Sequence, residues 1–176
     1  MKKRKMLVGL LTAALATVAA AGTASAAHSD GPVPKEVQVP DGARQIVAMH
    51  GHGVQKYQCA DGKWSLLEPD AILEEHGVAK ILHTRGPVWT SVVDGSSVQA
   101  KAIGTSAVDN AIPQLLLQAT SHSGAGLLAD VGYIQRLHTS GGVAPTGSCT
   151  ADQAPVSVPY QAEYVFWTDV TAPSGN

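Results

Sequence analysis

The segment 83–96 holds the residues of this chain best suited to chemistry. His83 and Trp89 stand near the two ends of a short predicted strand, and Asp94 follows in Asp94-Gly95-Ser96. An imidazole donates or accepts a proton near neutral pH, and an indole face stacks on a sugar or a planar ligand. We therefore expect one groove in which His83 hydrogen-bonds a ligand and Trp89 stacks on it. The alternative is structural: Trp89 fills the core and Asp94 only shapes a hairpin turn.

A second candidate group follows later in the chain. Gln135, Arg136 and Thr139 precede a Gly-Gly pair, and we expect Arg136 to hold an anionic or carbonyl group with the other two as secondary contacts. On a regular strand Gln135 and Arg136 face opposite sides, so only one of them can share a pocket with Thr139. A buried arginine needs a partner, for which Asp94 or Glu68 is available. Alternatively, Arg136 holds a loop through backbone carbonyls.

Metal and cofactor chemistry have little support in the sequence. His50 and His52 have the i, i+2 spacing that places two imidazoles on one face of a strand, with His83 or His122 as a third ligand. The pair lies among glycines in an apparent turn, however, and no His/Cys spacing is typical of a metal site. We predict neither a metal nor a cofactor.

Catalysis has no motif either. The chain lacks Gly-x-Ser-x-Gly and His-Glu-x-x-His, and Glu74-Glu75 precede a glycine in an apparent turn. The one enzymatic alternative is a hydrolase with His83 as general base and Asp94 as its orienting acid. That alternative requires His83 to lie within hydrogen-bond reach of an acid and to be open to solvent.

The elements that must position these residues are β-strands. Short runs of β-forming residues alternate with turn signals, which predicts an all-β, mostly antiparallel sandwich or barrel. We expect His50–Gly53 to form a tight turn and Pro69–His76 to form one short helical turn that ends at Gly77. In the last expected strand, 160–168, apolar residues alternate with Gln161 and Glu163. The other expected strands are 45–49, 54–59, 64–67, 78–83, 88–93, 97–103, 115–119 and 131–139.

The first 26 residues have the pattern of a secretory signal peptide. Four cations at 2–5 precede an uncharged apolar run from Met6 to Ala21, and Ala24-Ser25-Ala26 forms a small-x-small cleavage site. A retained anchor is less favoured because the run is short of the roughly 20 residues that span a bilayer. We expect a secreted chain with an extended arm at 27–42, one β-rich domain at 43–170 and a tail at 171–176.

Charge and cysteines limit the partners and the compartment. Loss of the four signal-peptide cations lowers Lys+Arg from 12 to 8 against 14 acidic residues, so the mature net charge is −6. An acidic chain without a basic cluster is not expected to bind nucleic acid, and the mature chain has no further apolar run that could anchor it in a membrane. Cys59 and Cys149 predict one disulfide in an exported protein; two free thiols or a metal pair are the alternatives.

Several motifs together resemble one family of exported proteins, the domain-of-unknown-function family numbered 3455. The resemblance covers nearly all of the mature chain, in order, and implies no activity. One departure is Gln114, which stands where the family pattern usually has an aromatic residue. The motifs are Gly53-Val54-Gln55-x-Tyr57-x-Cys59, Pro69-x-Ala71-x-Leu73, His83-x-x-Gly86-Pro87-x-Trp89, Asp94-Gly95-Ser96, Ile112-Pro113-x-Leu115-Leu116-Leu117, Gly124-x-Gly126-x-Leu128, Ile134-Gln135-Arg136-x-x-Thr139-x-Gly141-Gly142-x-Ala144-Pro145 and Val158-Pro159-Tyr160-x-Ala162-x-Tyr164-x-Phe166.

The sequence thus predicts a non-catalytic binding or structural module of the cell envelope or extracellular space. Its expected partner is a small molecule, a glycan or an envelope component. The extracellular hydrolase stays as the alternative. The candidate ligand-binding residues are His83, Trp89, Asp94, Gln135, Arg136 and Thr139.

Overall fold

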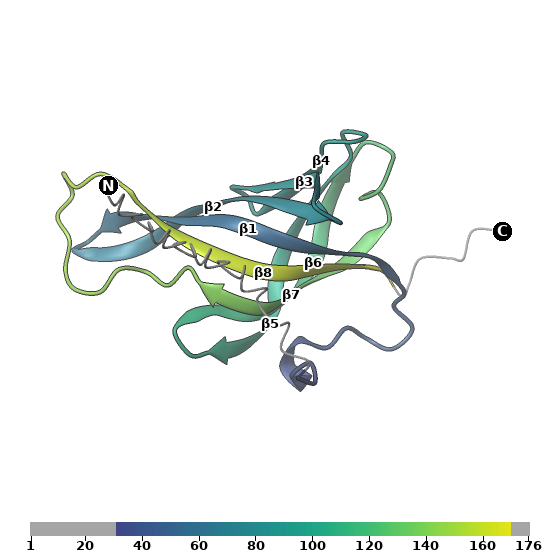
Figure 1. Ribbon diagram of the computed structural model, residues 1–176, viewed down its shortest axis with the longest axis horizontal. Helices are drawn as coiled ribbons and strands as arrows, with labels where there is room; N and C mark the ends of the chain where they lie inside the picture. Colours follow the sequence, from purple (N-terminus) through teal and green to yellow (C-terminus); the bar gives the residue numbers. More distant parts are fainter. Residues whose placement is uncertain (1–30, 170–176) are drawn as a thin grey trace, which may run out of the picture.

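Eight antiparallel strands close into a barrel in which each strand pairs with its neighbours in the sequence and β8 pairs with β1 (Figure 1). The computed structural model describes residues 31–169, so the predicted signal peptide and the tail at 171–176 lie outside the described residues. The all-β prediction is confirmed, and of the two architectures it is the barrel that forms. The strands are β1 Gln45–Ala60, β2 Lys63–Glu75, β3 Val78–Thr84, β4 Val88–Ser91, β5 Ser97–Val108, β6 Ala111–Ser123, β7 Val131–Gly141 and β8 Val156–Thr168.

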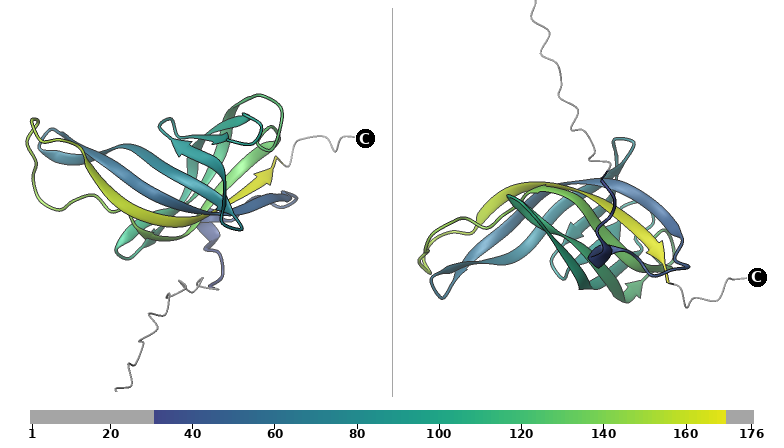
Figure 2. Two further views of the ribbon diagram at one scale, coloured as in Figure 1. Left: turned by 45° about the horizontal axis from the view of Figure 1, so that its top comes forward. Right: turned by 90° about the horizontal axis from the view of Figure 1, so that it is seen from below.

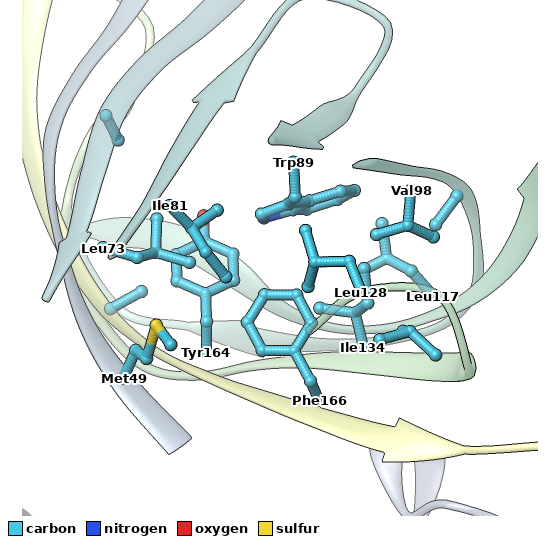
Figure 3. Packing of buried hydrophobic residues seen from close by; sticks show 14 of the residues in the cluster. Met49, Leu73, Ile81, Trp89, Val98, Leu117, Leu128, Ile134, Tyr164 and Phe166 are labelled. Atoms are coloured by element: carbon cyan, nitrogen blue, oxygen red, sulfur yellow. The ribbon is translucent and has the colours of Figure 1, made fainter. Parts of the chain in front are cut away.

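The core inside the barrel is built by side chains at alternate positions of the strands. On β8 the expected alternation is confirmed, because Tyr160, Ala162, Tyr164 and Phe166 are all buried. Figure 3 shows Tyr164 and Phe166 beneath Trp89 of β4 in the packed interior. These aromatic side chains come from strands on opposite sides of the barrel, so they tie its two walls together.

The expected turn at His50–Gly53 is wrong, because β1 runs unbroken through it. A Cβ on Gly51 would lie 2.7 Å from ring carbons of Tyr164, and one on Gly53 would lie 2.5 Å from the Cα of Ala71. These glycines therefore allow β1 to lie close to the Tyr164 ring and to the backbone of β2. Close approach of this kind is one of the reasons for a glycine inside a strand.

The expected helical turn at Pro69–His76 is also wrong, because β2 continues to Glu75. The turn that follows consists of His76 and Gly77, with φ of 51° and 75°, which suits a two-residue hairpin between β2 and β3. The one helix of residues 31–169 is a 3-10 turn, η1, at Lys35–Val37. Val37 is buried against the outside of β6, β7 and β8.

The wall of the barrel is shortest at β3 and β4. β3 pairs with β2 only from Ala71 to Glu75, and β4 pairs with β5 only from Val88 to Thr90. The remaining parts of β2 and β5 pair on one side alone, with β1 and β6 respectively. The interior therefore opens next to the β3–β4 turn, between the β1–β2 hairpin and the β5–β6 hairpin.

The predicted disulfide is present and fastens a projecting part of the fold. Cys59, at the tip of the β1–β2 hairpin, is bonded to Cys149 in the β7–β8 connection, with the two Cα atoms 5.7 Å apart. Figure 2 shows the hairpin and the connection projecting together from the barrel. Within residues 31–169, no helix is long and apolar enough to cross a membrane.

Candidate functional site

A cavity of about 560 Å³ lies inside the barrel at the opening below the β3–β4 turn. Most of its wall is apolar, with polar groups at a few points, which is the usual composition of a small-molecule site. The apolar wall is formed by Leu66, Leu67, Pro69, Pro87, Trp89, Ala100, Ala102, Leu115, Leu117 and Tyr164. The polar lining side chains are Gln55, Glu68, His83, Arg85, Lys101 and Arg136.

His83 and Trp89 meet on this wall because they are register partners on β3 and β4. Their rings stack with centroids 4.2 Å apart and planes inclined by 6°. Both are buried, with 3% and 1% of their surfaces exposed. Nδ1 of His83 lies 3.1 Å from the carbonyl oxygen of Val88, to which it donates. Burial lowers the pKa of His83 to about 4, so the imidazole is neutral at pH 7.

Arg136 reaches the cavity from β7, where it lies opposite Tyr164 of β8 and Leu115 of β6. Its Nε and Nη2 donate to the carbonyl oxygen of Pro113 at 3.2 and 2.9 Å. The alternative in which Arg136 binds a backbone carbonyl is therefore observed, although Pro113 belongs to a strand rather than to a loop.

No carboxylate of residues 31–169 lies within ion-pair distance of Arg136. The expected partner Glu68 is bonded instead by Lys56 and Arg85. Burial raises the pKa of Tyr57, Tyr160 and Tyr164, and the positive charge of Arg136 partly opposes this in all three. The cation thus lies among buried aromatic side chains without a counter-ion from the described part of the chain.

Two further donors of the cavity wall are buried without an acceptor. Nε2 of Gln55 and Nε1 of Trp89 have no hydrogen-bond partner within residues 31–169. A buried donor without a partner costs about 1–3 kcal/mol. Gln55, of which 2% is exposed, is the functional candidate that the sequence analysis missed. The available signal was a polar residue two positions before buried Tyr57, on the same face of β1.

The family model of proteins of unknown function, DUF3455, matches residues 72–168, more than half of the chain. The chain belongs to DUF3455. This confirms the resemblance drawn from the motifs. No curated protein and no solved structure matches the chain. The matched region runs from β2 to the end of β8, so it contains His83, Trp89 and Arg136, whereas Gln55 precedes it.

Asp94 does not join the cavity of this DUF3455 protein. Its Oδ1 accepts from the backbone N and Oγ of Ser96 at 2.9 and 2.6 Å, and its Oδ2 accepts from the N of Leu127 at 2.9 Å. These bonds, that of the Ser96 hydroxyl above all, hold the pKa of Asp94 well below its usual range. Because His83 bonds Val88 and Asp94 bonds its own turn, the structure does not assemble the base–acid pair of the hydrolase alternative.

Gln135 and Thr139 also lie away from the cavity. Gln135 donates from Nε2 to the carbonyl oxygen of Val37 at 2.7 Å and accepts from Nε1 of Trp167 at 2.8 Å. Thr139 donates its hydroxyl to the carbonyl oxygen of Ile112. Gln135 therefore fastens the η1 segment to the outside of the barrel, and Thr139 joins β7 to β6. Of the six predicted site residues, the cavity brings together His83, Trp89 and Arg136.

The remaining candidates have local roles. Gln114, the departure from the family pattern, accepts from the backbone N of His138 at 3.1 Å and does not line the cavity. The rings of His50 and His52 stack at 6.1 Å, and His52 lies 4.0 Å from a carboxylate oxygen of Glu74. Within residues 31–169, no three His, Cys, Asp or Glu side chains are grouped as a metal site requires.

Proposed function

We propose that this DUF3455 protein is a non-enzymatic binding protein that holds one small, mostly apolar molecule inside its barrel. A volume of about 560 Å³ falls within the range of roughly 300–1,000 Å³ typical of small-molecule sites. Eight-stranded barrels are wide enough to be filled by side chains or to hold one small ligand. In this barrel the shortened β3 and β4 provide the entrance.

One observation carries the proposal: the two residues whose buried donors lack an acceptor, Gln55 and Trp89, both line the same cavity. A core selected only for stability would pair or replace the amide of Gln55 and the indole N–H of Trp89, because each costs stability as it stands. A ligand with a hydrogen-bond acceptor offsets that cost when it binds. Retention of unpaired polar groups in an apolar wall is what a binding site requires.

The proposed place of action is outside the cytoplasm. The Cys59–Cys149 disulfide fits an oxidising compartment. The signal-peptide pattern of residues 1–26 supports export. We propose that the exported chain binds its ligand in the extracellular space or the cell envelope.

A neutral apolar fluorophore, N-phenyl-1-naphthylamine, tests the binding function without presupposing the ligand. We expect its fluorescence to rise on titration into the protein and to saturate at one molecule per chain. Ala100→Leu places a larger side chain on the cavity wall and should abolish the signal, because Ala100 is buried there. Ala79→Leu, the same change at an exposed site on β3, is the control. An unsaturable signal, or equal loss in both variants, would contradict the proposal.

A further inference from the structure

We propose that the ligand carries one negative charge, a carboxylate that binds Arg136, joined to an apolar body that lies against Trp89 and Leu117. This inference rests on the proposed binding function and names its ligand class. It follows from the charge of the cavity, the direction of its free donors and the character of its wall.

The cavity wall carries one positive charge that no carboxylate of residues 31–169 pairs with, that of the half-buried Arg136. Glu68 is paired with Lys56 and Arg85, at 3.3 and 3.0 Å, and therefore contributes no free charge. Lys101 is exposed to solvent, which screens its charge. His83 is neutral above about pH 5, since burial lowers its pKa to about 4. Arg136 is thus left without a carboxylate partner among the described residues.

Arg136 is only partly buried, and a charge that is partly removed from water is still stabilised by an opposite charge or by strong hydrogen bonds. A monoanion next to Arg136 gives a neutral pair. A dianion such as a phosphate monoester would leave one negative charge uncompensated in a mostly apolar wall. The charge balance therefore favours a carboxylate over a phosphate.

The geometry of the free donors also suits a carboxylate. Arg136 uses Nε and one N–H of Nη2 on Pro113. Arg136 also hydrogen-bonds the side chain of Tyr164. Two of the five N–H groups of its planar guanidinium remain, as many as a carboxylate can take up with its two oxygens. Gln55 offers a neutral amide donor from β1, on the other side of β8 from Arg136.

The rest of the cavity wall is mostly apolar and therefore suits an apolar ligand body. Leu66, Leu115, Leu117 and Tyr164 line the same space. Burial of apolar ligand surface there favours binding and offsets the costs of association. The matching ligand is therefore amphipathic, with one acidic end, such as a medium-chain or aromatic carboxylic acid.

Three probes with the same ten-carbon body separate these ideas: decanoic acid, decan-1-ol and decyl phosphate. Isothermal titration calorimetry at pH 8 should show the acid binding roughly 10- to 100-fold more tightly than the alcohol, as charged hydrogen bonds provide. Decyl phosphate, mostly dianionic at this pH, should bind more weakly than the acid. A stronger interaction with the phosphate would overturn the carboxylate assignment.

Arg136→Met should bring the affinity for decanoic acid down to that for the alcohol, and Arg136→Lys should restore part of the difference. Lys63→Met removes an exposed cation at the start of β2, outside the cavity, and it should change the preference by less than about threefold because exposed charges are screened. Should Arg136→Met fail to fold, two measurements still test the carboxylate assignment. The wild type should bind decanoic acid more tightly than the other two probes, and Gln55→Leu should reduce this preference.

The outcomes separate the two proposals. Equal affinities for acid and alcohol, unchanged in Arg136→Met, would contradict the carboxylate inference and leave the binding function standing. If none of the three probes binds and N-phenyl-1-naphthylamine gives no saturable signal, the cavity takes up water alone, and the proposed function itself is wrong.

Discussion

His83 and Trp89 stack face to face across β3 and β4, with ring centroids 4.2 Å apart. The Tyr164 ring contacts His83 in an edge-to-face arrangement, with the two ring centroids 5.6 Å apart. The imidazole thus behaves as a flat, neutral core side chain with one satisfied N–H. Its depressed pKa is a cost of burial in this arrangement, and the nearby charge of Arg136 adds to it.

This arrangement predicts acid sensitivity centred on His83. The folded-state pKa of about 4 lies below the ordinary value of 6.5, so the unfolded chain binds the proton more readily between these values. The unfolding free energy is therefore full above about pH 6.5 and falls as the pH is lowered towards 4, by at most about 3 kcal/mol. Urea unfolding at pH 4.5 and pH 7 measures the difference.

His83→Phe keeps a flat ring against Trp89 and removes the titrating group, so its stability should depend less on pH in this interval. His76→Asn, at an exposed hairpin position with φ of 51°, retains the wild-type dependence. Carboxylates whose pKa is lowered, such as Asp94 and Glu68, lose their contributions at more acidic pH. Equal pH profiles in wild type and His83→Phe would contradict the burial of a neutral imidazole.

The Asp94–Ser96 turn is predicted to serve stability and not binding. Oγ of the fully buried Ser96 donates to Asp94 and accepts from the backbone N of Leu128 at 3.1 Å. Ser96→Ala leaves that backbone N–H without its acceptor and should lower the unfolding free energy by about 1–3 kcal/mol. Asp94→Asn should lower the melting temperature as well.

Neither of these variants should change the affinity for N-phenyl-1-naphthylamine, because the turn lies outside the cavity. Ser65→Ala, an exposed serine on β2, is the control for the loss of a hydroxyl. A tenfold loss of fluorophore affinity in Asp94→Asn, without loss of stability, would contradict this prediction and would indicate that Asp94 takes part in binding.

The sequence predicted well those features that depend on neighbouring residues. The alternation on β8 placed Tyr160 and Tyr164 on the buried side. The Asp94-Gly95 turn correctly joined two paired strands, now seen as β4 and β5. Periodicity and turn chemistry act within a few residues, so one sequence suffices to read them.

Features that depend on distant packing were missed or misread. The local sequence predicts a turn at Gly51, whereas the ring that lies against it belongs to Tyr164, more than 100 positions away in the chain. The sequence predicts Gln135 as a ligand contact, whereas its amide donates to the carbonyl of Val37 on the outside of the barrel. Strand register decides both cases, and no local pattern reveals it.

Close packing at β1 predicts an ordered pair of glycine effects. A Cβ on Gly53 would lie 2.2 Å from the carbonyl oxygen of Asp70, and backbone cannot move aside easily. A Cβ on Gly51 meets ring carbons of Tyr164 at 2.7 Å, which a side-chain adjustment relieves in part. Gly53→Ala should therefore destabilise more than Gly51→Ala, with costs of about 1–3 kcal/mol or more. Chemical denaturation of both variants shows the order, and the reverse order would contradict this account of β1.

The Cys59–Cys149 bond should stabilise the fold by limiting the unfolded chain. It joins residues 90 positions apart, so replacing both cysteines by serine should lower the unfolding free energy by about 2–5 kcal/mol. Non-reducing intact-mass analysis of the wild type should show the chain two hydrogens lighter than its dithiol form. Dithiothreitol should destabilise the wild type and leave the double serine variant unchanged; an effect on both would indicate another cause.

Gln55 is predicted to lower the stability of the fold and to strengthen ligand binding. Its Nε2 is buried without an acceptor in the described chain, so Gln55→Leu removes an unpaired polar group from an apolar surrounding. The unfolding free energy should rise by about 1–2 kcal/mol, because the desolvation cost of that donor disappears. Affinity for decanoic acid should fall in the same variant, since the ligand loses a donor.

Gln58→Leu, at an exposed position of the same strand, makes the same substitution and should show neither effect. A loss of both stability and binding in Gln55→Leu would mean that the amide supports the fold, and the cavity's polar groups would then be structural.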